Sequence, residues 1–344
     1  MKTRKRTRPA NTPAVTPGAA TMAAMVQDQY GEAEDVLRLE RINRPEIAAG
    51  EVLVRVHAAG VDRGAWHLMS GLPYPVRLVA GVRTPRTRVR GMELAGRVAA
   101  VGSGVTGFKV GDEVFGIGEG AFAEYATAKQ GMIAPKPASL SFEQAAAVGV
   151  SACTALQAVR DHGRVQPGQQ VLVLGASGGV GTFAVQIAKA FGAVVTGVSS
   201  TSKVELVRSI GADHVIDYTL TNVTDGLQRY DVILDIGGNR PLTALRRALT
   251  PRGTLVIIGG ETGGRWLAGT DRQLRAMALS PLIGQTLRTF VATERSEDLA
   301  VLAELIESGT VTPVIDRTYP LAEAPAAIRH MQDGLARGKV VITI

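Results

Sequence analysis

A glycine-rich turn is the part of this sequence whose residue types and spacing point most directly to chemistry. Gly175-Ala-Ser-Gly-Gly-Val-Gly181 stands between an apolar run at 171–174 and a helical stretch that extends to 190, and a second apolar strand follows at 194–198. A turn of this kind frees backbone amides at a helix start and lets a pyrophosphate approach closely. The pattern predicts a dinucleotide site. The residues expected to bind the cofactor here are Ala176, Ser177, Gly178, Gly179, Val180 and Gly181.

The same turn also fits a second chemistry. Gly175-x-Ser177-x-Gly179 is the nucleophile pattern of serine hydrolases, which likewise lies between a strand and a helix. That alternative predicts an exposed serine and an oxyanion-hole loop, but no HGGG-type stretch precedes it, and Gly181 would have no role. The dinucleotide interpretation is therefore preferred. The acid that would complete the hydrolase is Asp235 or Asp316, and the histidine is His330.

The end of the second strand indicates which dinucleotide is bound. NAD-binding sheets carry an acid about 20 residues beyond the turn, which binds the ribose 2′-hydroxyl. This sequence has Ser199, Ser200 and Lys203 there, and no carboxylate before Glu205. Two hydroxyls and an ammonium suit a 2′-phosphate, so NADPH is the expected cofactor, with Tyr218 beside the adenosine. The alternative for Lys203 is a solvated residue in the first turn of a helix.

The elements around these residues predict an α/β protein. The 344 residues correspond to about two domains, and only 4% are aromatic, so the core must consist of Ala, Val, Leu and Ile. Residues 22–135 read as short strands and turns, and a capping box at Ser141–Gln144 opens a helical region. From Gln170 onward strands alternate with helices, which indicates a doubly wound parallel sheet.

The net charge of +7 is concentrated in a tail. Residues 1–21 hold five basic residues and no acid, and prolines at 9, 13 and 17 oppose a helix, so we expect a disordered segment. The nearly neutral remainder argues against a nucleic-acid surface. No apolar run reaches 18 residues, which argues against a membrane span. The single cysteine, Cys153, cannot form an internal disulfide, and this favours a reducing, cytoplasmic setting.

With these residues in hand, the sequence resembles the medium-chain dehydrogenase/reductase family, and within it the zinc-lacking quinone-oxidoreductase-like branch. The motifs that carry the resemblance are Gly91–Val98, Val101–Gly116, the glycine turn, Gly211–Tyr218 and Gly338–Ile344. The resemblance implies a small-molecule substrate and a homodimer. The implied divisions are the tail (1–21), a GroES-like catalytic domain (22–147), a Rossmann NADP-binding domain (148–291) and a segment that returns to the catalytic domain (292–344).

Zinc-dependent relatives bind their catalytic metal through cysteine and histidine. The matching positions here are Asp62, Met92 and Val150, a set that cannot supply tetrahedral nitrogen and sulfur ligands. Cys153 lies three residues beyond the third position and reads as a packing residue. The resemblance therefore implies zinc-independent hydride transfer to an electron-poor acceptor, such as a quinone or an α,β-unsaturated carbonyl. An NADPH-binding scaffold or sensor without turnover is the alternative.

The resemblance also implies where the reaction takes place. The nicotinamide would lie in the cleft between domains, beside Gly237, Ile258, Gly259 and Gly260. In relatives an asparagine commonly stands at the position of Asp62. The carboxylate here either donates a proton, if burial raises its pKa, or caps the helix that follows. The candidates for the acceptor pocket are Asp62, Trp66, Met92 and Phe122.

Overall fold

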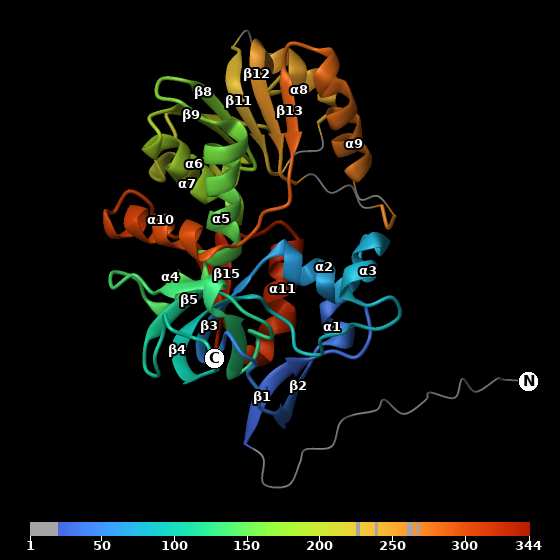
Figure 1. Ribbon diagram of the computed structural model, residues 1–344. Helices are drawn as coiled ribbons and strands as arrows, with labels where there is room; N and C mark the ends of the chain where they lie inside the picture. Colours follow the sequence, from blue (N-terminus) through green and yellow to red (C-terminus); the bar gives the residue numbers. More distant parts are fainter. Residues whose placement is uncertain (1–19, 225–227, 238–239, 260–263, 267–268) are drawn as a thin grey trace, which may run out of the picture.

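The computed structural model describes residues 20–224, 228–237, 240–259, 264–266 and 269–344. It contains two large sheets, and helix α5 (Gly149–Gln157) runs from one toward the other (Figure 1). The predictions for Gly260 and for residues 1–19 of the tail fall outside the described residues. The first strand begins at Thr21, one residue earlier than expected.

The first large sheet confirms the predicted β-rich region. Its strands follow the order β14-β15-β3-β4-β5-β7, and β6 also pairs with β3. Strands β14 and β15 come from the carboxyl-terminal part of the chain, and β15 is antiparallel to β3. The chain thus returns to its first sheet. The strands are β3 (Glu51–Val61), β4 (Glu93–Val101), β5 (Glu113–Ile117), β6 (Tyr125–Lys129), β7 (Ile133–Pro135), β14 (Ile315–Pro320) and β15 (Lys339–Thr343).

The second large sheet is parallel throughout and confirms the doubly wound prediction. Its order, β10-β9-β8-β11-β12-β13, reverses direction at β8, where the glycine turn begins. Ligands bind at such a reversal, outside the carboxyl ends of the strands. The strands are β8 (Gln170–Leu174), β9 (Val194–Ser199), β10 (His214–Asp217), β11 (Tyr230–Asp235), β12 (Leu249–Ile257) and β13 (Thr286–Thr289).

Helices cover both faces of the parallel sheet (Figure 1). Val171 and Val173 of β8 pack with α6, whereas Leu172 and Leu174 pack with α8 and α9 on the opposite face. This alternation explains why the strand reads as a continuous apolar run. The other helices are α1 (Ala33–Val36), α2 (Arg63–Ser70), α3 (Arg77–Ala80), α4 (Phe142–Ala146), α6 (Gly179–Ala190), α7 (Val204–Ser209), α8 (Leu242–Ala248), α9 (Thr270–Leu279), α10 (Ser296–Glu307) and α11 (Ala324–Gln332).

Helix α5 joins the two sheets through a shared core. One apolar cluster contains Ala58 and Phe115 from the first sheet, Cys153 and Leu156 from α5, and Val173 from the second. Cys153 is buried, which confirms that it is a packing residue. The predicted capping box is also present, because Ser141 accepts from the Gln144 amide while the Gln144 side chain accepts from the Ser141 amide.

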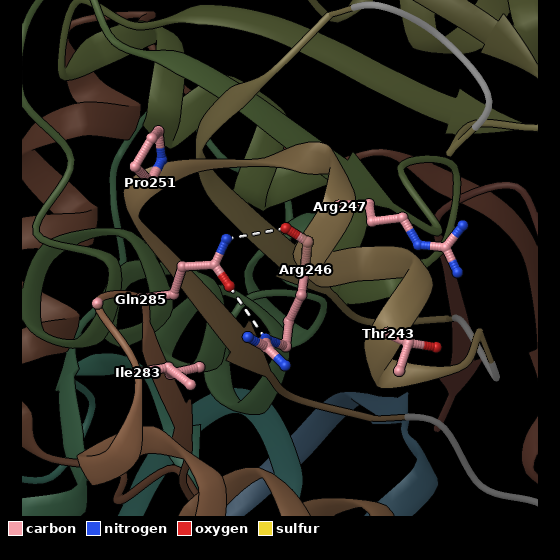
Figure 2. A pocket seen from close by; sticks show the side chains of 7 residues that line it. Thr243, Arg246, Arg247, Pro251, Ile283 and Gln285 are labelled. Carbon is pink, nitrogen blue, oxygen red and sulfur yellow. Dashed lines mark hydrogen bonds between the residues drawn. The ribbon is translucent and has the colours of Figure 1, made fainter.

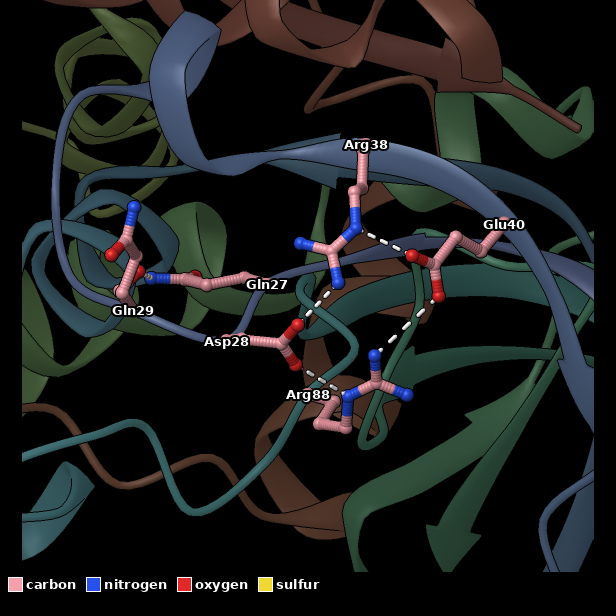
Figure 3. A network of polar contacts seen from close by, with 6 residues as sticks. All are labelled: Gln27, Asp28, Gln29, Arg38, Glu40 and Arg88. Atoms are coloured by element: carbon pink, nitrogen blue, oxygen red, sulfur yellow. Dashed lines mark hydrogen bonds and ion pairs between the residues drawn. The ribbon is translucent and has the colours of Figure 1, made fainter. Parts of the chain in front are cut away.

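A network of charged side chains joins a small antiparallel pair, β1 (Thr21–Val26) and β2 (Arg38–Asn43), to the segment that leads into β4. Arg88 donates to Asp28 Oδ1 at 2.7 Å and lies 3.4 Å from Glu40 Oε2. Arg38 pairs with the same two carboxylates and closes a four-membered network (Figure 3). The network fixes β2 to the segment that leads into β4.

The glycine turn shows why its glycines are required. Gly175 has a φ of +80°, and a Cβ there would lie 2.9 Å from the Gly237 amide. Gly181 faces the same turn from α6, and a Cβ on it would lie 2.0 Å from the Gly175 carbonyl oxygen. By contrast, a Cβ on Gly178 would lie at an ordinary 3.5 Å from that oxygen. The helix therefore packs on the strand at a distance that only glycine at 181 allows.

We expect Gly181→Ala to destabilise the fold and Gly178→Ala to leave stability close to wild type. Forcing a methyl group against backbone lowers the free energy of unfolding by roughly 1–3 kcal/mol. Urea denaturation of the two variants measures the difference. Equal stabilities would contradict the close packing of α6 on the turn.

Candidate functional site

A cavity of about 760 Å³ lies at the carboxyl edge of the parallel sheet. Its opposite wall comes from the end of β3, the start of α2 and the start of β15, through residues 61–64 and 338–340. Most of the predicted cofactor residues meet here although they are far apart in sequence. Those that line the cavity are Ser177, Gly178, Gly179, Val180, Ser199, Ser200, Lys203, Tyr218, Gly237, Ile258 and Gly259.

Two residues of the predicted set lie beneath the turn and do not line the cavity. Ala176 is fully buried, and a Cβ on Gly197 of β9 would lie 3.1 Å from its methyl group. Gly181 is buried against the Gly175 carbonyl. Both residues shape the turn from below.

Of the acceptor-pocket candidates, Asp62 lines the cavity and the other three do not. Phe122 is fully buried in the core of the first sheet, against Gly91. Trp66 packs at the edge of that core. Met92 is half-buried, with its methyl group 3.2 Å from where a Cβ on Gly64 would lie. A role in the acceptor pocket stays a prediction for these three residues.

Asp62 caps α2, as one of the two alternatives predicted, and it also lines the cavity, while its role as a proton donor stays a prediction. Its Oδ1 accepts from the Ala65 amide at 2.9 Å. Its Oδ2 is buried and has no hydrogen-bond partner among the described residues. Burial, and then the nearby Glu93, raise the pKa of Asp62 to about 6, although Lys339 acts in the opposite direction. The side chain can therefore hold a proton at Oδ2 close to neutral pH.

A buried ion pair beside Asp62 was not predicted from the sequence. Lys339 of β15 pairs with Glu93 of β4, and their side chains are 2% and 0% exposed. Lys339 Nζ also donates to Ser151 Oγ at 3.1 Å and to the Val61 carbonyl at 3.2 Å. Lys339 and Ser151 line the cavity. The Gly338-Lys339 motif was the available signal, but it does not reveal the partner on β4.

Lys203 makes a contact that the sequence did not reveal. Its Nζ donates to the carbonyls of Gly334 and Ala336 at 2.7 and 2.8 Å, and so links the parallel sheet to the segment before β15. Burial lowers the pKa of Lys203, while Asp316 acts in the opposite direction. An ammonium has three donors, so one remains for a further acceptor.

Of the residues in the hydrolase alternative, His330 and Asp316 contact each other, and Asp235 pairs with an arginine. His330 Nε2 lies 2.6 Å from Asp316 Oδ2, and Asp235 pairs with Arg272 at 2.6 Å. Ser177 is 7% exposed. Among the described residues no hydrogen bond joins the Ser177 hydroxyl to His330, so the pair of nucleophile and base that a hydrolase needs is not formed.

A second cavity, of about 460 Å³, lies at the amino ends of β12 and β13 (Figure 2). Arg246 Nε donates to Gln285 Oε1 at 3.1 Å, and the Gln285 amide donates back to the Arg246 carbonyl at 2.8 Å. None of the predicted site residues that the structure describes lines this cavity.

The described residues also contain no helix with the length and apolarity to span a membrane.

Comparisons with known proteins agree with this architecture. Residues 48–138 match the alcohol dehydrogenase GroES-like domain, and residues 210–342 match the model described as zinc-binding dehydrogenase. The chain is 33% identical to mouse NAD(P)H oxidoreductase RTN4IP1, mitochondrial, over 95% of this chain and 90% of that protein. It is 34% identical to tomato 2-methylene-furan-3-one reductase, over 93% and 79%.

Solved structures give the same result. The quinone oxidoreductase from Coxiella burnetii superposes with a TM-score of 0.81 at 27% identity, over 94% of this chain and all of that one. A mycobacterial protein solved with NADPH superposes with a TM-score of 0.79 at 28% identity, over the same shares. Together with the fold, these relatives identify the chain as an oxidoreductase that uses a nicotinamide cofactor. The chain belongs to the medium-chain dehydrogenase/reductase family.

We expect Asp62→Asn to stabilise the protein above pH 6 and to have little effect below pH 4. The folded pKa of about 6 lies above the ordinary value of 3.8, so the folded state binds the proton more tightly. As the pH rises between these two values and above them, ionisation of Asp62 lowers the free energy of unfolding by roughly 1–3 kcal/mol. Asparagine keeps the helix cap and removes the charge.

Urea denaturation at pH 4 and pH 7.5 measures this effect. The control is Glu323→Gln, which neutralises an exposed carboxylate away from the cavity. A stability gain of Asp62→Asn that is the same at both pH values would contradict the raised pKa.

Proposed function

We propose that this oxidoreductase transfers hydride from NADPH to a quinone or an α,β-unsaturated carbonyl without a metal ion. The observation that carries the proposal is a single cavity that contains both the glycine turn and the buried Asp62. Relatives named as a furanone reductase, an alkenal/one oxidoreductase and a quinone oxidoreductase support this class of acceptor.

The cavity fits a dinucleotide along the carboxyl edge of the sheet. The amides at the start of α6 would hold the pyrophosphate, because Gly178 and Gly179 bring no side chain there. Ser199, Ser200, Lys203 and Tyr218 would surround the adenosine ribose on the side of β9 and β10. Gly237, Ile258 and Gly259, on the side of β11 and β12, would line the nicotinamide.

When bound, the nicotinamide supplies a hydride, and the residues around it determine how the acceptor receives a proton. A hydride that reaches the β-carbon of an enone, or the ring of a quinone, places negative charge on oxygen. Protonated Asp62 would then deliver the proton from Oδ2 to that oxygen or, in the enone, to the α-carbon. The acceptor gains two electrons and two hydrogens in total, and Asp62 is reprotonated from water.

Zinc independence is part of the proposal. Asp62 and Val150 line the cavity, and Met92 is half-buried near it. One carboxylate, one thioether and one isopropyl group do not form a tetrahedral site for Zn²⁺. Delocalised charge in a quinone or an enone needs no metal-polarised oxygen, so this donor set is compatible with the proposed reaction.

The homodimer and the cytoplasmic location stay predictions. Relatives include proteins named as mitochondrial and as chloroplastic, and these names leave the compartment of this chain open.

Turnover with a panel of quinones and enones tests the proposed function. We expect NADPH oxidation to persist in a chelator and kcat/KM to fall as the pH rises through about 6, the pKa of Asp62. In Asp62→Asn this step in the profile should disappear and kcat should fall by roughly 10²-fold, the lower contribution of a general acid. Activity that depends on added zinc, or an unchanged pH profile in the variant, would contradict the proposal.

For the cofactor, we expect Lys203→Ala to weaken the binding of NADPH roughly 10- to 150-fold and to leave the binding of NADH almost unchanged. The variant loses a charge-assisted contact with the 2′-phosphate, and NADH has no such phosphate. Ser199→Asp should weaken NADPH further by repulsion and favour NADH. Calorimetric titration of both cofactors measures this, with Lys129→Ala, an exposed lysine of β6, as control. Equal losses for the two cofactors would show that Lys203 acts only through its contact with Gly334 and Ala336.

A further inference from the structure

The guanidinium of Arg272 connects two loops that line the cavity. Arg272 lies in the first turn of α9, and its Nη1 is 2.6 Å from Asp235 Oδ2 at the end of β11. The same nitrogen donates to the Arg240 carbonyl at 3.1 Å, and Nη2 donates to the Gly259 carbonyl at 3.2 Å. One side chain thus holds the loop after β11 and the loop after β12.

These two loops are in backbone contact with each other. The Asp235 carbonyl accepts from the amides of Ile258 and Gly259 at 2.9 and 3.2 Å. A Cβ on Gly259 would lie 2.3 Å from the Ile236 carbonyl oxygen. A displacement of one loop therefore displaces the other. The cavity-lining residues on these loops are Ile236, Gly237, Arg240, Ile258 and Gly259.

Arginine is the residue type that this position requires. The Asp235 side chain is 0% exposed and that of Arg272 is 13% exposed, so the carboxylate needs a cation beside it. The planar guanidinium presents donors in several fixed directions and can reach a carboxylate and two carbonyls at once. A lysine ammonium at this site can neutralise Asp235 but cannot span both loops.

We propose that Arg272 is a positioning residue that fixes the nicotinamide end of the cofactor site and leaves the adenosine end unaffected. The side chains expected around the adenosine lie across β8, on β9 and after β10, and none of the described contacts of Arg272 reaches them. The inference rests on the cofactor placement given under the proposed function.

Binding of NADPH and of 2′,5′-ADP, which lacks the nicotinamide half, tests this directly in the full chain. We expect Arg272→Gln to weaken NADPH roughly tenfold or more and to bind 2′,5′-ADP within about twofold of wild type. With an enone or quinone, kcat should fall by up to about 100-fold, the loss expected for a misplaced reacting atom. The matched control is Arg275→Gln, one helical turn away, where an exposed arginine pairs with Asp271 at 3.1 Å.

Arg272→Lys keeps a charge beside Asp235 and decides the question if the glutamine variant does not fold. This variant should also bind NADPH more weakly than wild type and 2′,5′-ADP about as tightly, with a smaller loss of NADPH affinity than the glutamine variant. Equal weakening of both ligands, or no weakening of either, would overturn the inference. If wild type reduces none of the acceptors but the two ligands still separate, the proposed acceptor class fails and the role of Arg272 stands.

Discussion

The buried pair of Glu93 and Lys339 is the interaction on which the site depends most. Glu93 Oε1 accepts from the amides of Val150 and Ser151 at 2.7 and 3.2 Å, at the start of α5, while its other oxygen pairs with Lys339. A carboxylate at a helix start is favoured by the helix dipole, and the ammonium and amides together satisfy it without water. Strand β4, strand β15 and helix α5 are thereby held at one point beside the cavity.

The same pair shapes the chemistry of its neighbour. Asp62 lies within electrostatic reach of both members, and its pKa reflects burial first, the repulsion of Glu93 next, and the opposing attraction of Lys339. A carboxyl group that can be protonated near neutral pH is therefore a consequence of burial first and of Glu93 on β4 next, while the Lys339 ammonium on β15 limits how far the pKa rises. The wall that completes the cavity, at 338–340, comes from the same strand. Folding of the last residues and function of the first domain are thus coupled.

The features that could be predicted from the sequence are those that a local pattern of residues determines. The apolar run at 171–174, the spacing of Gly175 and Gly181, and the capping box at Ser141 each depend on neighbours within a few positions, and each was found as expected. The partners that lie far apart in sequence were not predictable. Lys339 is 246 residues from Glu93, and Lys203 is 131 residues from Gly334. Such contacts depend on how sheets dock, which periodicity does not encode.

In the proposed reaction, one cavity brings the nicotinamide and Asp62 to the same acceptor. A crystal structure with NADP⁺ and an unreactive enone or quinone analogue measures this directly. We expect the nicotinamide C4 within about 3–3.5 Å of the acceptor carbon, and the acceptor oxygen within hydrogen-bond distance of Asp62 Oδ2. An acceptor oxygen directed away from Asp62, or bound to a metal ion, would contradict it.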